Sequence, residues 1–70
     1  NWKALLQDYS QKKFQQPPVY RLISESGPDH NKVFEVVVAL NQEDVGFGRG
    51  ESKKEAQQSA AEDALNKLSL

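Results

Sequence analysis

The sequence predicts an α+β fold with the element order α-β-β-β-α. Apolar residues recur at helical spacing only near the two ends of the chain, whereas the middle alternates apolar and polar residues as half-buried strands do. Short connections rich in turn-forming residues separate the strands, so neighbouring strands should be antiparallel. We therefore expect a three-stranded antiparallel sheet with both helices packed on one face.

The first helix is expected over about residues 2–13 and should end before Pro17-Pro18. Its apolar stripe, at positions i, i+3, i+4 and i+7, consists of Trp2, Leu5, Leu6 and Tyr9. A second stripe with the same spacing lies roughly opposite and consists of Ala4, Gln7, Asp8 and Gln11. Spacing leaves two readings of this second stripe open: a solvated outer face, or a surface whose amides suit ribose hydroxyls and base edges.

The strands are expected at residues 19–24, 33–40 and 45–48, with a loop over 27–32 and a polar hairpin connection over 41–44. In the first strand, Tyr20 and Leu22 would share one face and Arg21 would lie on the other. The apolar face of the second strand consists of Phe34, Val36, Val38 and Leu40. The third strand is expected to be interrupted by glycine.

The last helix is expected from Ser52 to the end of the chain. Its apolar stripe is mostly alanine, consisting of Ala56, Ala60, Ala61, Ala64, Leu65 and Leu68. Alanines would let the helix lie close to the strands. Gly46, Gly48 and Gly50 weaken a strand, and their cost implies a bend or a close backbone approach there.

Ser52 and Glu55 have the spacing of a capping box, which makes Lys53 and Lys54 the first two helical residues. A helix N-terminus is already partly positive, so each lysine there should cost roughly 0.3–1 kcal/mol. Free N–H groups and two ammonium groups at one place suit an anion, most obviously a phosphate. The competing explanation is that these lysines serve only solubility; their position at the cap favours binding.

Length and composition predict one small domain, residues 1–70, stabilised by packing alone. The chain has no cysteine and a single histidine, so a zinc site is not expected. No apolar run approaches the roughly 18 residues of a membrane span, and we expect a cytoplasmic protein without membrane contact. Nine basic and ten acidic residues give a net charge of −1, which argues against nucleic-acid binding globally but permits a local basic surface.

Catalysis is not expected of this chain. His30 is the only candidate base for a serine nucleophile at Ser24, Ser26 or Ser52, and the carboxylates are scattered over surface positions. We therefore expect no catalytic residue, no metal, no cofactor and no small-molecule substrate.

Three runs of residues indicate a family. They are Gly27-Pro28-x-His30 followed by Phe34, Gly48-x-Gly50-x-Ser52-Lys53-Lys54-x-Ala56, and Ala60-Ala61. With these runs the whole chain resembles the double-stranded RNA-binding domain, and among its members it is most similar to the C-terminal domain of bacterial-type ribonuclease III. The resemblance implies the α-β-β-β-α fold and binding of A-form RNA by shape over about 16 base pairs.

The resemblance also implies three contact regions. The first-helix stripe, Ala4, Gln7, Asp8 and Gln11, would lie in one minor groove, and the loop residues Pro28, Asp29 and His30 would enter the next. Phosphates across the intervening major groove would be contacted by Lys53 and Lys54, with Ser52 and Gln57 beside them. Further phosphate contacts are possible at Lys12, Lys13 and Lys32.

The sequence departs from the family at two positions, and one of them lowers the expected affinity for RNA. Gln57 stands where the family often has a third lysine, and Asp8 stands where it often has glutamate. Fewer cations predict weaker binding with a shallower salt dependence. The alternative is a protein-interaction or dimerisation domain with weak or no RNA binding. The leading hypothesis is a monomeric, non-catalytic module of a ribonuclease III-like protein that binds double-stranded RNA.

Overall fold

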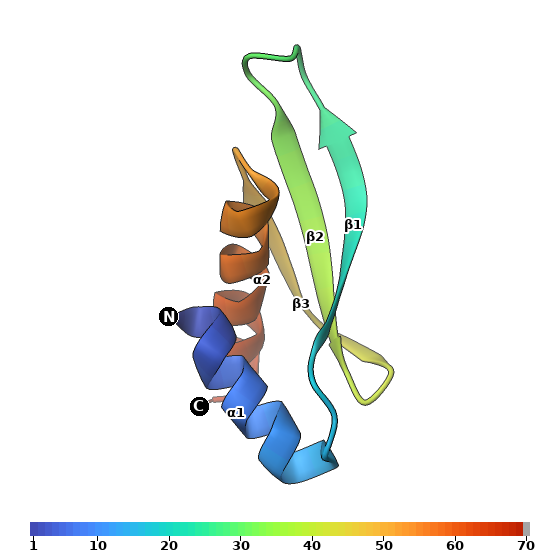
Figure 1. The fold of residues 1–70 in the computed structure, drawn as a ribbon, viewed down its shortest axis with the longest axis vertical. Coiled ribbons are helices and arrows are strands. Elements are labelled where there is room, and N and C mark those ends of the chain that lie inside the picture. Colours follow the sequence, from blue (N-terminus) through green and yellow to red (C-terminus); the bar gives the residue numbers. More distant parts are fainter. Residues whose placement is uncertain (70) are drawn as a thin grey trace.

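The computed structural model describes residues 1–69 as a helix, three strands and a second helix (Figure 1). These elements are α1 (Trp2–Phe14), β1 (Val19–Ser26), β2 (Val33–Leu40), β3 (Glu43–Gly50) and α2 (Lys53–Lys67). β2 lies in the centre of the sheet and pairs antiparallel with both neighbours. Both helices lie on the same side of the sheet, with α1 packed largely against α2 (Figure 1). The predicted fold class is confirmed.

The outer strands are longer than the alternation of residues predicts. β1 continues to Ser26 beyond an irregularity between Leu22 and Ser24. β3 begins at Glu43, because Asn41 and Gln42 both have positive φ, 51° and 71°, and close the hairpin after two residues. The expected four-residue connection over 41–44 is therefore wrong. α2 ends at Lys67, and residue 70, which the prediction included in this helix, lies outside the described residues.

The glycines of β3 do not interrupt the strand; they let α2 lie directly on it. A Cβ atom at Gly48 would collide with the backbones of Ala56 and Ala60, and one at Gly46 would collide with Ala60 as well. The close backbone approach expected at these glycines is confirmed. It fixes α2, and therefore its N-terminus, against β3.

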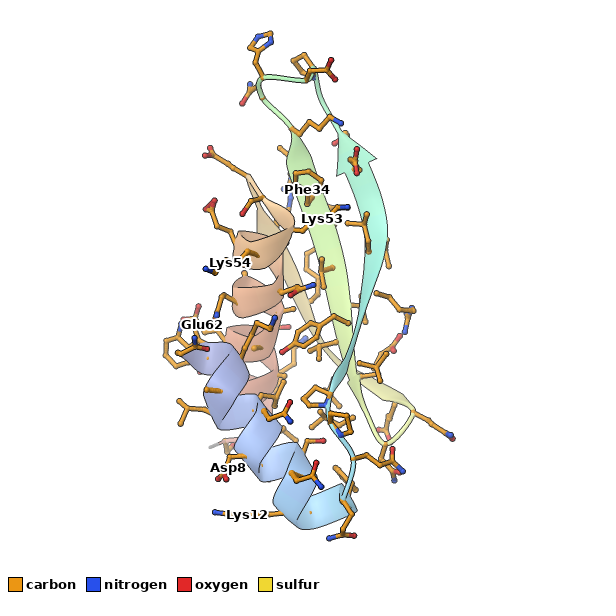
Figure 2. The ribbon with its side chains drawn as sticks, viewed as in Figure 1. Asp8, Lys12, Phe34, Lys53, Lys54 and Glu62 are labelled. Atoms are coloured by element: carbon orange, nitrogen blue, oxygen red, sulfur yellow. The ribbon has the colours of Figure 1, made fainter. Side chains whose placement is uncertain are left out.

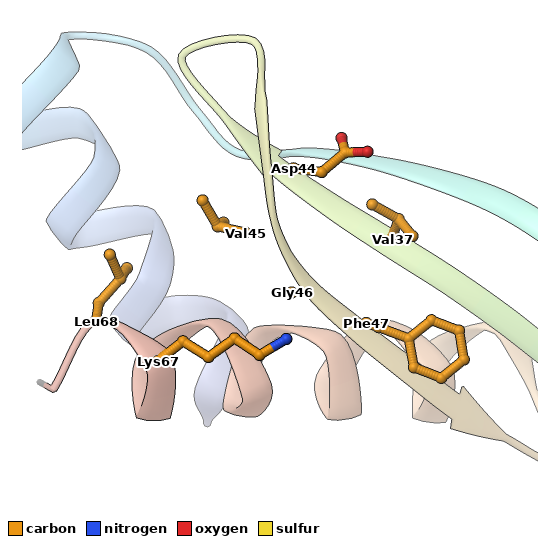
Figure 3. Close-up of a pocket in the computed structure, with 7 residues that line it drawn as sticks. All are labelled: Val37, Asp44, Val45, Gly46, Phe47, Lys67 and Leu68. Atoms are coloured by element: carbon orange, nitrogen blue, oxygen red, sulfur yellow. The ribbon is translucent and has the colours of Figure 1, made fainter.

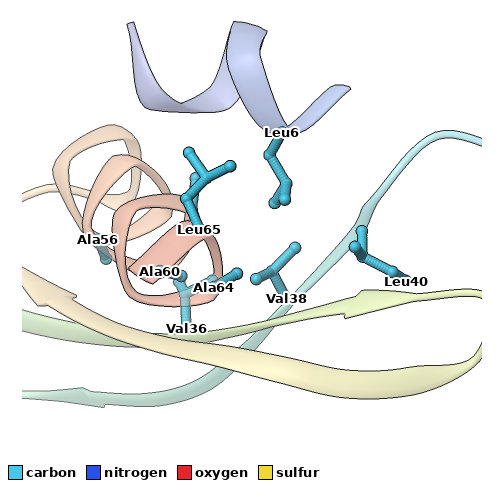
Figure 4. Packing of buried hydrophobic residues seen from close by; sticks show 9 residues of the cluster. Leu6, Val36, Val38, Leu40, Ala56, Ala60, Ala64 and Leu65 are labelled. Atoms are coloured by element: carbon cyan, nitrogen blue, oxygen red, sulfur yellow. The ribbon is translucent and has the colours of Figure 1, made fainter. Parts of the chain in front are cut away.

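The hydrophobic core lies between the sheet and the two helices (Figure 4). Its buried members are Leu6, Val36, Val38, Leu40, Ala56, Ala60, Ala61, Ala64 and Leu65. Phe34, Tyr9 and Tyr20 are partly buried and pack against this cluster. Leu22 remains 45% exposed, because α2 packs over β3 and β2 and leaves the edge strand β1 less covered.

The orientation of α1 differs from the predicted one. Trp2 and Leu5 were expected in the core, yet they are 44% and 56% exposed. Leu6 is fully buried as predicted, and the polar Ser10, which was not in the predicted stripe, is fully buried beside it and donates its hydroxyl to the Gln16 carbonyl at 2.6 Å. The helix meets α2 and the sheet along this narrow line, so the flank that carries Trp2 and Leu5 stays in solvent.

Candidate nucleic-acid interface

The N-terminus of α2 is capped as the sequence predicts, but only by half of the capping box. Ser52 is extended, with φ −144° and ψ 162°, and its Oγ accepts from the Glu55 N–H at 3.1 Å. Within residues 1–69 the hydrogen bonds do not include the expected return from the Ser52 N–H to the Glu55 carboxylate. Lys53 and Lys54 follow, both exposed, in the first turn, where backbone N–H groups have no intrahelical acceptor.

The basic side chains separate into two groups according to their partners. Within residues 1–69, five of the nine lie within salt-bridge distance of a carboxylate: Lys12, Arg21, Lys32, Arg49 and Lys67. Those without such a partner in the same part of the chain are Lys3, Lys13, Lys53 and Lys54. Three of these four lie at or beside the N-terminal half of α2 (Figure 2).

The polar face of α1 is exposed as predicted, but it is divided between two hollows. Ala4 and Gln7 face Lys54 across a hollow of about 370 Å³, which we call the α1–α2 hollow. It is lined by Asn1, Lys3, Ala4, Gln7, Tyr20, Lys54 and Gln58. Two of the four residues of the predicted stripe thus lie beside one of the two predicted phosphate-binding lysines.

Asp8 lies on the other flank of α1. It lines a hollow of about 510 Å³ together with the exposed Trp2 and Leu5, and it forms an ion pair with Lys12 at 3.1 Å (Figure 2). Gln11 is exposed and lines neither hollow. The structure therefore does not gather the whole predicted stripe at one place.

The loop between β1 and β2 lies at the far end of the molecule from α1 (Figure 1). Pro28, Asp29 and His30 are all exposed there, and the Asn31 N–H donates to the Pro28 carbonyl at 2.9 Å. Gly27 has a φ of 96°, and a Cβ atom at this position would meet the Asn31 carbonyl. This glycine permits the tight turn that projects the three side chains outward.

The base of this loop is electrostatically connected to α2. Lys32 donates to Glu25 at 2.8 Å, and this hydrogen bond, followed by the charge of Lys32, lowers the pKa of the Glu25 carboxyl. The charge of Lys53, in the first turn of α2, lowers the same pKa further. Lys32 is therefore partly neutralised, whereas Lys53 has no such direct pair within the described chain.

The remaining predicted phosphate contacts are also engaged within the protein. The ammonium of Lys13 lies 5.6 Å from the centre of the Tyr9 ring and 5.8 Å from that of Phe14. Gln57 accepts a hydrogen bond from the Lys3 ammonium at 2.6 Å. The sequence did not single out Lys3; its only signal was that it lies one turn before Gln7 in the same helix.

A third hollow, of about 350 Å³, lies between β3 and the C-terminal end of α2, away from these residues (Figure 3). Its two charged lining groups are already paired, Asp44 with Arg21 and Lys67 with Asp63. Within residues 1–69, no three His, Asp or Glu side chains are placed to share a metal ion. No helix in that range has the length and apolar character needed to cross a membrane.

The arrangement is that of a binding module with an extended surface. The molecule measures 40 × 20 × 16 Å, and the loop, the N-terminus of α2 and α1 follow one another along its long axis (Figure 1). Lys53 and Lys54 lie in the middle of this surface, and Gln7 of α1 and His30 of the loop lie on either side of them. Such a surface suits an extended, regularly charged polymer better than a small molecule.

The chain belongs to the double-stranded RNA binding motif family, and the sequence model of this family matches residues 2–68. It is 59% identical over 70 residues to Ribonuclease 3 of Protochlamydia amoebophila, covering 100% of this chain and 29% of that protein. It is 48% identical over 69 residues to Ribonuclease 3 of Natranaerobius thermophilus, covering 99% of this chain and 30% of that one. The chain thus spans less than a third of the curated relatives it matches.

Solved structures agree with this assignment. The first dsRBD of protein HYL1 has a TM-score of 0.71 and 37% identity, covering 91% of this chain and 90% of that one. The second dsRBD of DRB4 has a TM-score of 0.69 and 31% identity, with coverages of 99% and 96%. The chain is therefore a double-stranded RNA-binding module and not itself a catalytic domain.

Proposed function

We propose that this domain binds A-form RNA duplexes by shape, with Lys53 and Lys54 on phosphates and polar groups on both sides in the minor grooves. The observation that carries this proposal is the meeting of an unpaired Lys54 with Ala4 and Gln7 around the α1–α2 hollow. A lysine that contacts phosphate and an amide that contacts sugar or base edges would then engage adjacent parts of one duplex.

The loop would supply the second minor-groove contact through Pro28, Asp29 and His30. These residues are exposed at the end of the molecule opposite α1, with Lys53 and Lys54 between (Figure 2). A minor groove, a major groove and the next minor groove follow one another along an A-form duplex in the same order. The other predicted residues would contribute less, because each is remote from the α1–α2 hollow, uncharged, or engaged with another side chain of the protein. They are Asp8, Gln11, Ser52, Gln57, Lys12, Lys13 and Lys32.

A direct test compares RNA and DNA duplexes of equal length and sequence, titrated with the domain at low salt. We expect tighter binding to RNA, because 2′-hydroxyls and the wide, shallow minor groove distinguish A-form RNA. Equal affinity for the two duplexes would contradict recognition of A-form shape. A salt-insensitive dimer that ignores RNA, seen by size exclusion with light scattering, would favour a protein-interaction domain instead.

The relatives named Ribonuclease 3 support a second part of the proposal. The domain would present double-stranded RNA to a separate catalytic domain of a cytoplasmic RNA-processing nuclease, and would itself be monomeric. The isolated domain, incubated with magnesium and duplex RNA, should leave the RNA intact while retarding it in a gel. Cleavage products from the purified domain would overturn this division of roles.

A further inference from the structure

Within residues 1–69, Lys3 has no carboxylate partner, and it is not part of the predicted site. Its ammonium donates to the Gln57 side-chain oxygen at 2.6 Å and lies 5.1 Å from the centre of the Tyr20 ring. Both partners are uncharged: burial raises the pKa of the Tyr20 hydroxyl to about 12, so the phenol stays neutral. Lys3 is thus held in place by two groups that carry no opposing charge.

The position of this charge matters because Lys3 lines the same hollow as Lys54. One ammonium comes from α1 and the other from α2, with Gln7 beside them. Among the described residues, none of those lining this hollow carries a carboxylate. Two positive charges at one opening raise the local concentration of an anionic polymer and strengthen its attraction to the surface.

The packing of α1 against α2 does not by itself require the hydrogen bond between the Lys3 ammonium and Gln57. The Lys3 backbone N–H donates to the Gln58 side-chain oxygen at 3.2 Å, and the Gln58 amide donates to Asn1 Oδ1 at 3.1 Å. These two hydrogen bonds already join the start of α1 to α2, and neither uses the ammonium. An ammonium has three donors, and Gln57 accepts from one of them, so others remain for a ligand oxygen.

We propose, given the RNA-binding function proposed above, that Lys3 is a third phosphate-contacting cation of this surface, positioned by Gln57 and the Tyr20 ring. From the sequence alone, Gln57 is expected to leave this surface one cation short, because it stands where the family often has a lysine. In the folded protein Gln57 instead anchors a cation that is supplied from the other helix.

The test measures affinity for an RNA duplex as a function of salt concentration for Lys3→Gln. We expect binding about 3- to 10-fold weaker at low salt, and a log–log salt slope reduced in magnitude by about 1, because one fewer counterion is released. Lys67→Gln removes a charge of the same kind from the last turn of α2, away from the α1–α2 hollow, where Lys67 is already paired with Asp63. This control should keep the wild-type slope.

Two further variants separate charge from structure. Lys3→Gln combined with Gln57→Lys returns one ammonium to this contact from α2 and should restore the salt slope. Gln57→Ala should give an intermediate loss, since Lys3 remains but is less well positioned. Thermal unfolding of each variant checks that the fold is intact; a lowered slope together with a wild-type melting temperature supports a contact with RNA.

The outcomes distinguish this inference from the function on which it rests. If the wild-type domain binds duplex RNA and Lys3→Gln keeps both its affinity and its salt slope, Lys3 is not a phosphate contact, while the proposed function stands. If the wild-type domain does not bind duplex RNA, both fail. If Lys3→Gln combined with Gln57→Lys does not restore the wild-type salt slope, the position assigned to this phosphate contact is wrong.

Discussion

At the scale of single residues, lysines in this protein differ by what lies next to them. Lys12 and Lys67 form exposed i,i+4 pairs with Asp8 and Asp63, and pairs of this kind contribute little to stability. Lys53 and Lys54 have no carboxylate partner within residues 1–69 and occupy the positive end of α2. Their placement is unfavourable for the free protein, and a bound phosphate would relieve it.

Removing Lys53 and Lys54 should change the stability of the free domain and its affinity for RNA in opposite directions. Lys53→Ala combined with Lys54→Ala should stabilise the free domain, by up to about 1 kcal/mol per residue, because it removes like charges from the helix N-terminus. The same change should weaken duplex RNA binding and reduce the magnitude of the salt slope by about 2. Chemical denaturation and salt-dependent titration measure the two effects.

Lys67→Ala provides the matched control for the double variant. It removes a cation from the last turn of α2, where positive charge is favourable. We expect equal or lower stability and unchanged binding. If the double variant binds RNA as the wild type does, Lys53 and Lys54 are surface residues without a role in recognition.

The uncharged residues of the surface should behave differently from the lysines. Gln7→Ala should reduce the preference for RNA over DNA, because an amide facing the α1–α2 hollow can contact sugar hydroxyls and base edges. His30→Ala at the loop tip should have the same effect. The salt slope should change little in either variant, and parallel titrations on RNA and DNA duplexes measure both quantities. A slope reduced as in the lysine variants would show that these residues contact phosphates instead.

At the scale of elements, the contact between β3 and α2 positions the centre of the proposed site. Gly46 and Gly48 bring the strand against the helix backbone, and the small side chains of Ala56 and Ala60 complete that contact. A helix packed this closely cannot shift along the strand without a clash, because protein interiors are densely packed. The N-terminus of α2 is thereby held at a constant distance from the β1–β2 hairpin.

Gly48→Ala tests this contact. The added methyl group would meet the backbones of Ala56 and Ala60, which cannot move aside as a flexible side chain can. We expect the free energy of unfolding to fall by about 1–3 kcal/mol or more, measured by denaturant titration. Arg49→Ala, an exposed position in the same strand, should change it by only about 0.5 kcal/mol. A neutral Gly48→Ala would mean that α2 is free to move away from the sheet.

At the scale of the whole molecule, the proposed function depends on an elongated shape. The hairpin β1–β2 carries its loop beyond the N-terminus of α2, and α1 lies at the opposite end (Figure 1). This order gives one surface three separate exposed regions, which we propose as contacts, along a 40 Å axis. A rigid surface of this length can recognise the repeat of grooves in a duplex, which is a property of shape and not of base sequence.

The sequence alone determined the class of fold and the surface residues proposed for recognition. Alternation in 33–40, the Ser52 cap and the alanine stripe of α2 are local patterns whose physical meaning does not depend on the rest of the chain. The expected helices and strands, and the exposure of Gln7, His30, Lys53 and Lys54, could therefore be predicted.

Only the tertiary structure decided which face of α1 packs against the rest of the protein and which charged side chains find a partner. Trp2 and Leu5 satisfy the apolar spacing of α1, but the helix contacts its neighbours along the line of Leu6 and Ser10. Gln57 reads as a missing cation until Lys3 is seen to bond to it from a residue 54 positions away. Packing between elements selects one face among several that local spacing permits. Which charges stay unpaired depends on residues far apart in the sequence. Neither the packed face of α1 nor the set of unpaired charges could therefore be predicted from the sequence alone.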